Sequence, residues 1–196
     1  MMKRSQQFDL GLDRTRIKDV RDGARQAATV DALLQRLFDP RPNRRWEVQV
    51  LADEVGMGKT FVGLGTAFSV LEAMQNGTSA GDLRGCYQKV LIVTPQNSAL
   101  FAKWRREVSE FVKRCVLPEY REQAGRWFTP TTVDRLDELV VELRRRGTAP
   151  RVVVANMGIF DSGRLRHYDV KRRHLLGVLF RYWGRRFKGK NCANLL

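Results

Sequence analysis

The nine residues from Ala52 to Thr60 constrain the fold of this chain more than any other stretch, and they read Ala-Asp-Glu-Val-Gly-Met-Gly-Lys-Thr. The apolar segment 46–51 precedes them and predicts a short strand, and segment 61–74 predicts a helix that is apolar nearly all round. A glycine-rich turn between a strand and a helix is the setting of a phosphate-binding loop. The sequence therefore predicts an α/β fold organised around a nucleotide site.

Each residue type in this turn has a chemical use. Gly56 and Gly58 can adopt backbone angles that a Cβ would penalise, so that successive N–H groups turn toward phosphate oxygens. Lys59 can supply a charge to the β- and γ-phosphates, and the Thr60 hydroxyl can ligate Mg²⁺. The structural alternative is a glycine-containing turn with a surface lysine. The predicted ATP-binding residues of the turn are Asp53, Glu54, Val55, Gly56, Met57, Gly58, Lys59 and Thr60, with Thr60 as the metal ligand.

One departure from the general phosphate-loop pattern is informative. That pattern places a glycine at position 53, where this chain has Asp53 followed by Glu54. The string Asp-Glu-x-Gly-x-Gly-Lys-Thr resembles motif I of the Swi/Snf-type ATPases, a branch of helicase superfamily two. The resemblance implies a RecA-like domain with a parallel sheet flanked by helices, ATP and Mg²⁺ as cofactors, and movement along double-stranded DNA.

A second block strengthens the resemblance. Segment 89–94 predicts a buried parallel strand that ends at Pro95, and a helix with Trp104, Glu107 and Phe111 follows it. Together they resemble motif Ia of the same family, in which the turn after the strand touches nucleic acid. Helix capping by Asn97 or Ser98 is an equally good explanation of the polar turn. The resemblance implies Gln96, Asn97 and Ser98 as nucleic-acid contacts, and Asn156 as a further one where the buried strand 151–155 ends.

Gln26 is a further candidate at the nucleotide site. It lies in a predicted helix, 24–38, whose apolar residues recur at helical spacing. In superfamily-two helicases a glutamine upstream of motif I recognises adenine, and Gln26 stands at about the right distance. A solvated glutamine is at least as good an explanation.

The rest of the chain predicts three regions. Residues 1–20 are polar and mixed in charge and predict an irregular arm, and 161–196 predicts a basic amphipathic segment. For 21–160 the resemblance implies a partial RecA-like ATP-binding domain. Within the domain, 115–130 predicts a loop, and 131–134 resembles a capping box before a helix. In the final region the basic helix could cover a core, bind nucleic acid or lie on a membrane.

Composition narrows the partners. The net charge is +15, and ten Lys or Arg against one Asp fall between Arg164 and Lys190, which favours a polyanionic partner. No apolar run is long enough to span a bilayer, so we expect a cytoplasmic or nucleoid-associated protein without a membrane partner. The three cysteines, Cys86, Cys115 and Cys192, lack zinc spacing and predict structural or incidental roles.

Hydrolysis would need an acid after a second apolar strand, and no Asp-Glu pair follows one outside the turn. The resemblance covers about 26–160 and stops before the family's Asp-Glu-x-His motif. We therefore expect the front part of a Swi/Snf-like DEAD/DEAH-type helicase or double-stranded DNA translocase, truncated or split, for which a second chain supplies the missing helicase domain. We also expect poor solubility of the chain in isolation, because strand edges are left open. The alternatives are a non-catalytic nucleic-acid-binding protein with a relic loop, and a phosphate-loop enzyme of another class.

Overall fold

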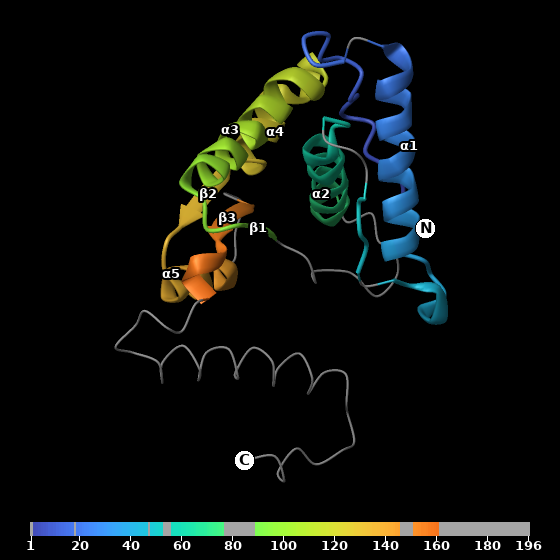
Figure 1. The fold of residues 1–196 in the computed structure, drawn as a ribbon. Helices are drawn as coiled ribbons and strands as arrows, with labels where there is room; N and C mark the ends of the chain where they lie inside the picture. The colour runs from blue at the N-terminus through green and yellow to red at the C-terminus, as the bar shows by residue number, and fades with distance from the viewer. Residues whose placement is uncertain are drawn as a thin grey trace.

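The computed structural model describes residues 2–17, 19–46, 48–52, 56–76, 89–145 and 151–160. They form an α/β fold with five α-helices and three parallel strands (Figure 1). The elements are α1 (Val20–Leu37), η1 (Pro42–Arg44), α2 (Lys59–Gln75), β1 (Val90–Thr94), α3 (Ser98–Cys115), η3 (Pro118–Tyr120), α4 (Arg121–Trp127), β2 (Pro130–Val133), α5 (Leu136–Arg144), β3 (Val152–Asn156) and η4 (Met157–Phe160).

The sheet has the order β1-β3-β2, with β3 in the centre. Val152 and Val154 belong to the main core, while Val153 and Ala155 pack with Leu136 and other residues of a smaller cluster. Because successive side chains of a strand point to opposite faces, the sheet has apolar packing on both faces. The expectation that 151–155 is a buried strand is confirmed.

The other parallel strand, β1, is less buried than its apolar sequence predicts. It pairs with β3 from Val90↔Val152 to Thr94↔Asn156, but its other edge meets no described strand. Val93 is 43% exposed as a result. The parallel pairing was predicted correctly, whereas full burial was wrong because β1 is an edge strand.

The predicted strand over 46–51 is wrong. No strand is assigned in the described part of this segment, and Val48 and Val50 are 76% and 82% exposed. Alternating apolar residues become a strand only when a neighbouring strand accepts their backbone hydrogen bonds, and no described strand does so. Residues 48–52 lead into the turn without belonging to the sheet.

Helix α2 is a core element, as its apolar sequence predicts. It packs beside α1 and near α3 (Figure 1). Phe68 and Leu71 on this helix are fully buried. Phe68 is surrounded by rings from other elements, and the ring contacts involve Phe8, Phe111, Trp127 and Phe128.

The segment 115–130 is not the loop that its Pro118 and Gly125 predict. It contains η3 and the seven-residue helix α4, whose Trp127 and the following Phe128 are buried. The capping-box interpretation of 131–134 is also wrong, because Pro130–Val133 is β2 and the N-cap of α5 is Arg135, without a side-chain cap. Pairing with β3 and packing of two aromatic rings outweigh the local turn signals here.

The N-terminal residues 2–17 are irregular, as predicted, but they are packed rather than loose. Phe8, Leu10 and Ile17 are buried, and Phe8 forms an antiparallel bridge with Val116. The Cys115 thiol lies in this contact region, and burial raises its pKa to about 12, consistent with a structural role. The predicted basic segment 161–196, with Cys192, and the loop carrying Cys86 lie outside the described residues.

Candidate phosphate-binding turn

Two glycines shape the turn before α2. Gly56 has φ +88° and Gly58 has φ +82°, and no non-glycine residue among those described has a positive φ. This region of backbone space penalises any side chain with a Cβ. At Gly58 a Cβ would in addition lie 2.4 Å from Gln26 Nε2, whereas at Gly56 it would meet nothing within 4 Å. The local conformation that the sequence predicted for both glycines is therefore present.

The turn opens directly onto the N-terminus of α2. Gly58 is the N-cap, and Lys59 and Thr60 are the first two helical residues. The helix has 17 residues and no acidic residue in its first turn, so its dipole favours an anion at this end. Asp53, Glu54 and Val55 lie outside the described residues.

Helix α1 holds the middle of the turn through one carbonyl. Arg25 donates a hydrogen bond from Nη2 to the Met57 carbonyl oxygen at 3.1 Å, and Gln26 donates from Nε2 to the same oxygen at 3.4 Å. A trans peptide directs its C=O and N–H to opposite sides. Since the Met57 carbonyl faces α1, the N–H of Gly58 in the same peptide faces away from α1, where it can donate to an anion.

Gln26 is 3% exposed, so the interpretation as a solvated glutamine is wrong. Its amide contacts the turn instead, and its Oε1 accepts a hydrogen bond from Arg16 Nη1 at 3.2 Å. The structure thus brings Gln26 and the turn together. The role in adenine recognition stays a prediction.

The residues Arg16, Arg25 and Asp13 were missed by sequence reasoning. Arg25 adjoins Gln26 and could have been found from its position on the same helix. Arg16 and Asp13 come from the irregular arm, whose fold carries no periodic signal. Their places depend on contacts between distant segments.

Asp13 is a buried carboxylate with charged neighbours. Burial on its own would raise the pKa of Asp13, but the Thr15 hydrogen bond and the positive charges of Arg114 and Arg16 outweigh burial and hold the pKa below its ordinary value of 3.8. The nearest charged atoms are Arg114 Nη1, 3.5 Å from Oδ1, and Arg16 Nε, 3.6 Å from Oδ2. The charged form of Asp13 is therefore the form that stabilises the arm.

Replacing Asp13 by asparagine is expected to lower the free energy of unfolding at pH 7 by about 1.5–3 kcal/mol, the range for hydrogen bonds to charged groups. Because the folded pKa is lowered, this contribution is fully present above 3.8, the value in the unfolded chain, and is lost as the pH falls through the folded pKa. Urea unfolding of both proteins between pH 7 and pH 3 measures it. As a control, Glu119→Gln on the exposed surface should change stability by less than about 0.5 kcal/mol at any pH. A pH-independent difference for Asp13→Asn would contradict the assignment.

The predicted nucleic-acid contacts lie at the carboxyl ends of β1 and β3. Gln96 and Asn156 both reach Gly158, since a Cβ there would lie 2.8 Å from Gln96 Nε2 and 2.8 Å from Asn156 Oδ1. Asn97 caps α3, because its Oδ1 accepts hydrogen bonds from the N–H groups of Ala99 and Leu100. For Asn97 the structure therefore supports the capping explanation. Ser98 is exposed as the first residue of α3.

Thr94 adds an unpredicted feature beside this group. It is fully buried, and its hydroxyl has no hydrogen-bond partner among the described residues. Its Cα partner in the sheet is Asn156. A buried hydroxyl and two carboxamides thus lie together at the carboxyl ends of β1 and β3. Open α/β sheets bind ligands at the carboxyl ends of their strands.

The chain matches no protein-family model, no curated protein and no solved structure.

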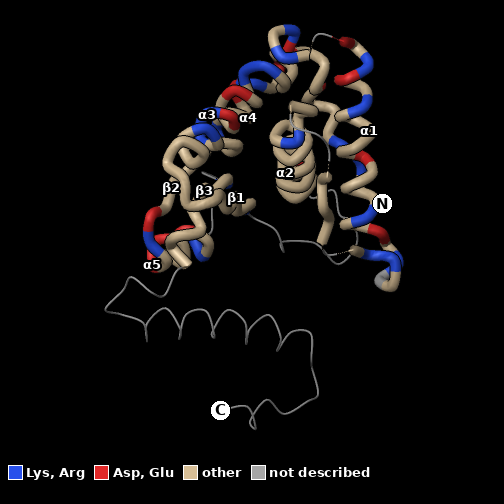
Figure 2. The backbone as a smooth tube through the Cα atoms, in the orientation of Figure 1, with Lys and Arg blue, Asp and Glu red and all other residues tan. Residues whose placement is uncertain are grey.

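The charges on the surface are mixed. Blue and red segments alternate along α1 and α3 in Figure 2, in line with ion pairs such as Arg114 with Glu110. No group of three or more His, Cys, Asp or Glu in the described ranges could hold a metal ion, and none of the described helices is long and apolar enough to cross a bilayer. A magnesium ligand set made of protein groups alone is thus not visible in this part of the chain.

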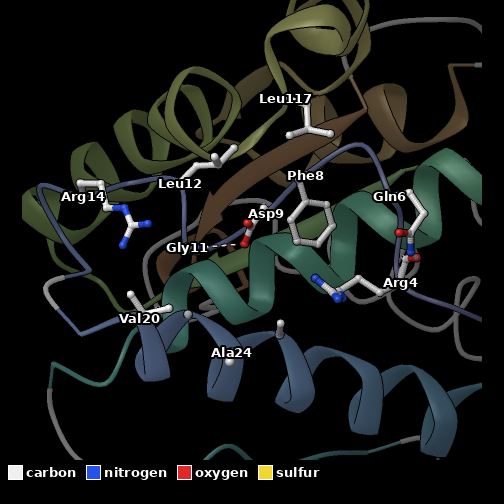
Figure 3. A pocket seen from close by; sticks show the side chains of 12 residues that line it. Arg4, Gln6, Phe8, Asp9, Gly11, Leu12, Arg14, Val20, Ala24 and Leu117 are labelled. Carbon is white, nitrogen blue, oxygen red and sulfur yellow. Dashed lines mark hydrogen bonds between the residues drawn. The ribbon is translucent and has the colours of Figure 1, made fainter.

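A pocket of about 550 Å³ lies between the N-terminal arm and α1 (Figure 3). Phe8 and Leu12 contribute apolar walls, and Arg4 and Arg14 lie at different ends of it. None of the predicted site residues lines this pocket. It is therefore separate from the candidate phosphate site.

Proposed function

We propose that this chain is the N-terminal ATP-binding part of a Swi/Snf-like helicase or double-stranded DNA translocase with a RecA-like fold. The observation that carries the proposal is the pair of positive-φ glycines immediately before Lys59, Thr60 and the long helix α2. This arrangement fits a triphosphate, because N–H groups, a cation and a hydroxyl follow one another at a helix N-terminus.

In this proposal the chain's own groups bind and orient. The backbone of 56–59 would cradle the phosphates, Lys59 would offset their charge, and the Thr60 hydroxyl would ligate Mg²⁺. Mg²⁺ would supply charge neutralisation on the phosphate oxygens. Gln96, Asn156 and Ser98 are proposed contacts to the DNA backbone, because they lie together at the carboxyl ends of β1 and β3.

The experiment that tests the proposal is binding of a fluorescent ATP analogue, alongside ATP turnover with and without double-stranded DNA. We expect binding without turnover, because no acid follows a second apolar strand in the sequence. Turnover stimulated by DNA would overturn the claim that the chain cannot hydrolyse ATP alone. Absence of binding would overturn the nucleotide site and leave the non-catalytic nucleic-acid-binding alternative, which the charge of +15 supports.

Lys59→Ala is expected to weaken binding of the ATP analogue by about 10- to 100-fold, since a hydrogen bond to a charged group contributes about 1.5–3 kcal/mol. Its thermal midpoint should stay close to that of the parent, because Lys59 is a half-buried residue at the start of α2 rather than a core residue. Lys103→Ala, on the exposed face of α3, is the matched control and should bind as the parent does. Equal affinity of the Lys59 and Lys103 variants would refute the assignment.

A further inference from the structure

Arg16 lies where the N-terminal arm meets the turn, and it joins several elements. Its guanidinium carbon lies 3.8 Å from the centroid of the Phe61 ring on α2. Its Nη1 donates to Gln26 Oε1 on α1, and its Nη2 donates to the Leu10 carbonyl at 3.4 Å. Asp13, only 3% of whose side chain is exposed, pairs with Arg16 Nε. The side chain is thus held in one position by four groups.

This position decides which end of the Gln26 amide faces the turn. A carboxamide has an accepting oxygen and a donating nitrogen, and packing alone distinguishes them poorly. A guanidinium can only donate, so the amide oxygen must face Arg16. The Gln26 nitrogen then faces the Met57 carbonyl, to which it donates. The reverse orientation would bring two oxygens together at Met57 and leave the guanidinium facing an N–H group.

The orientation extends to the phosphate donor itself. With the Met57 carbonyl held toward α1, the N–H of Gly58 faces the other side of the peptide plane. If this carbonyl is released, the peptide can rotate about the ψ angle of Met57 and the φ angle of Gly58, and a glycine at position 58 tolerates a wide range of φ.

We propose that Arg16 is a positioning residue for the phosphate turn: it fixes the amide of Gln26, which together with Arg25 holds the Met57–Gly58 peptide with its N–H toward the phosphates. The inference deepens the proposed function and depends on it for the identity of the ligand. Arg16 itself touches no phosphate in this proposal, and its effect passes through Gln26. Asp13 contributes by holding the guanidinium in place.

A double-mutant cycle tests this coupling, using Arg16→Ala, Gln26→Ala and the combined variant. Each single change is expected to weaken binding of the ATP analogue about five- to tenfold, the loss of about one hydrogen bond. The combined variant should lose no more than the larger single loss, because both changes break the same path. Arg14→Ala, on the same arm and exposed, is the control and should bind as the parent does.

A second measurement reads the turn without nucleotide. Hydrogen exchange of the amides of 56–62 in the free protein should be faster in Arg16→Ala and in Gln26→Ala than in the parent. Exchange in the combined variant should be no faster than in the faster of the two single variants. Thermal unfolding of each variant is recorded, so that the variants are compared at a temperature at which all of them are folded. If Arg16→Ala is unfolded, Arg16→Lys, which keeps the charge over Phe61, replaces it.

The outcomes separate the two claims. The positioning role would be overturned if the loss of affinity or of exchange protection in the combined variant equals the product of the two single losses. It would also be overturned if Arg16→Ala leaves the exchange of the turn amides unchanged. If the parent binds no nucleotide but the exchange pattern is as expected, the proposed function fails and the positioning of the turn stands.

Discussion

Phe68→Ala is expected to lower the free energy of unfolding by about 4–5 kcal/mol, near the upper end of the range for a buried phenylalanine. Phe68 is 0% exposed and lies in the middle of α2. Its ring centroid lies between 4.8 and 5.7 Å from those of four other rings, so the substitution removes apolar burial and four aromatic contacts together. Those rings are Phe8, Phe111, Trp127 and Phe128.

The loss should be large because the site cannot collapse. The four surrounding rings come from the arm, from α3 and from the end of α4, so they are fixed by separate elements. Urea unfolding followed by tryptophan fluorescence measures the change. Phe101→Ala is the matched control, since Phe101 is only half-buried at the edge of the same core, and its cost should be about 1–2 kcal/mol. Equal costs for the two variants would show that Phe68 is not the centre of the core.

Gly58→Ala is expected to reduce affinity for the ATP analogue by at least about 100-fold, and to lower the free energy of unfolding by about 1–3 kcal/mol. An alanine at φ +82° is strained, and its Cβ would lie 2.4 Å from Gln26 Nε2. Either the turn must change its conformation or Gln26 must leave the Met57 carbonyl. Both changes move the peptide whose N–H faces the proposed phosphate.

Gly63→Ala provides the control within the same helix. A Cβ at Gly63 would meet nothing within 4 Å, and the residue lies inside α2. Alanine in a helix interior is more stable than glycine by about 0.5–1 kcal/mol, so this variant should unfold at a higher urea concentration and bind nucleotide as the parent does. Binding of the Gly58 variant at parental affinity would show that the left-handed conformation is not needed for the site.

The sheet of the described residues has an open edge at β1. The outer edge of β1 pairs with no described strand, and Val48 and Val50 in the segment before the turn are exposed. Exposed apolar edges favour association with other chains, so poor solubility stays a prediction.

Several elements could be predicted because their signals are local. The helix 59–75 and the strands 90–94 and 152–156 follow from continuous apolar runs between turn residues. Two of the errors have the same cause. Segment 130–133 pairs with β3 and is a strand, whereas 46–51 has no described strand beside it and is none, and no local pattern records the presence of a neighbouring strand.

The candidate site divides in the same way. The sequence by itself determined the glycines with positive φ, the cation and hydroxyl at the start of α2, and the cap of α3, because backbone freedom and helix-end chemistry depend on residues next to one another. Only the tertiary structure decided that Gln26 is buried against Met57, and that Arg16 from an irregular arm fixes its amide. Gln26 and Met57 are more than thirty residues apart in the sequence. Contacts of this kind form only when the arm, α1 and the start of α2 pack together.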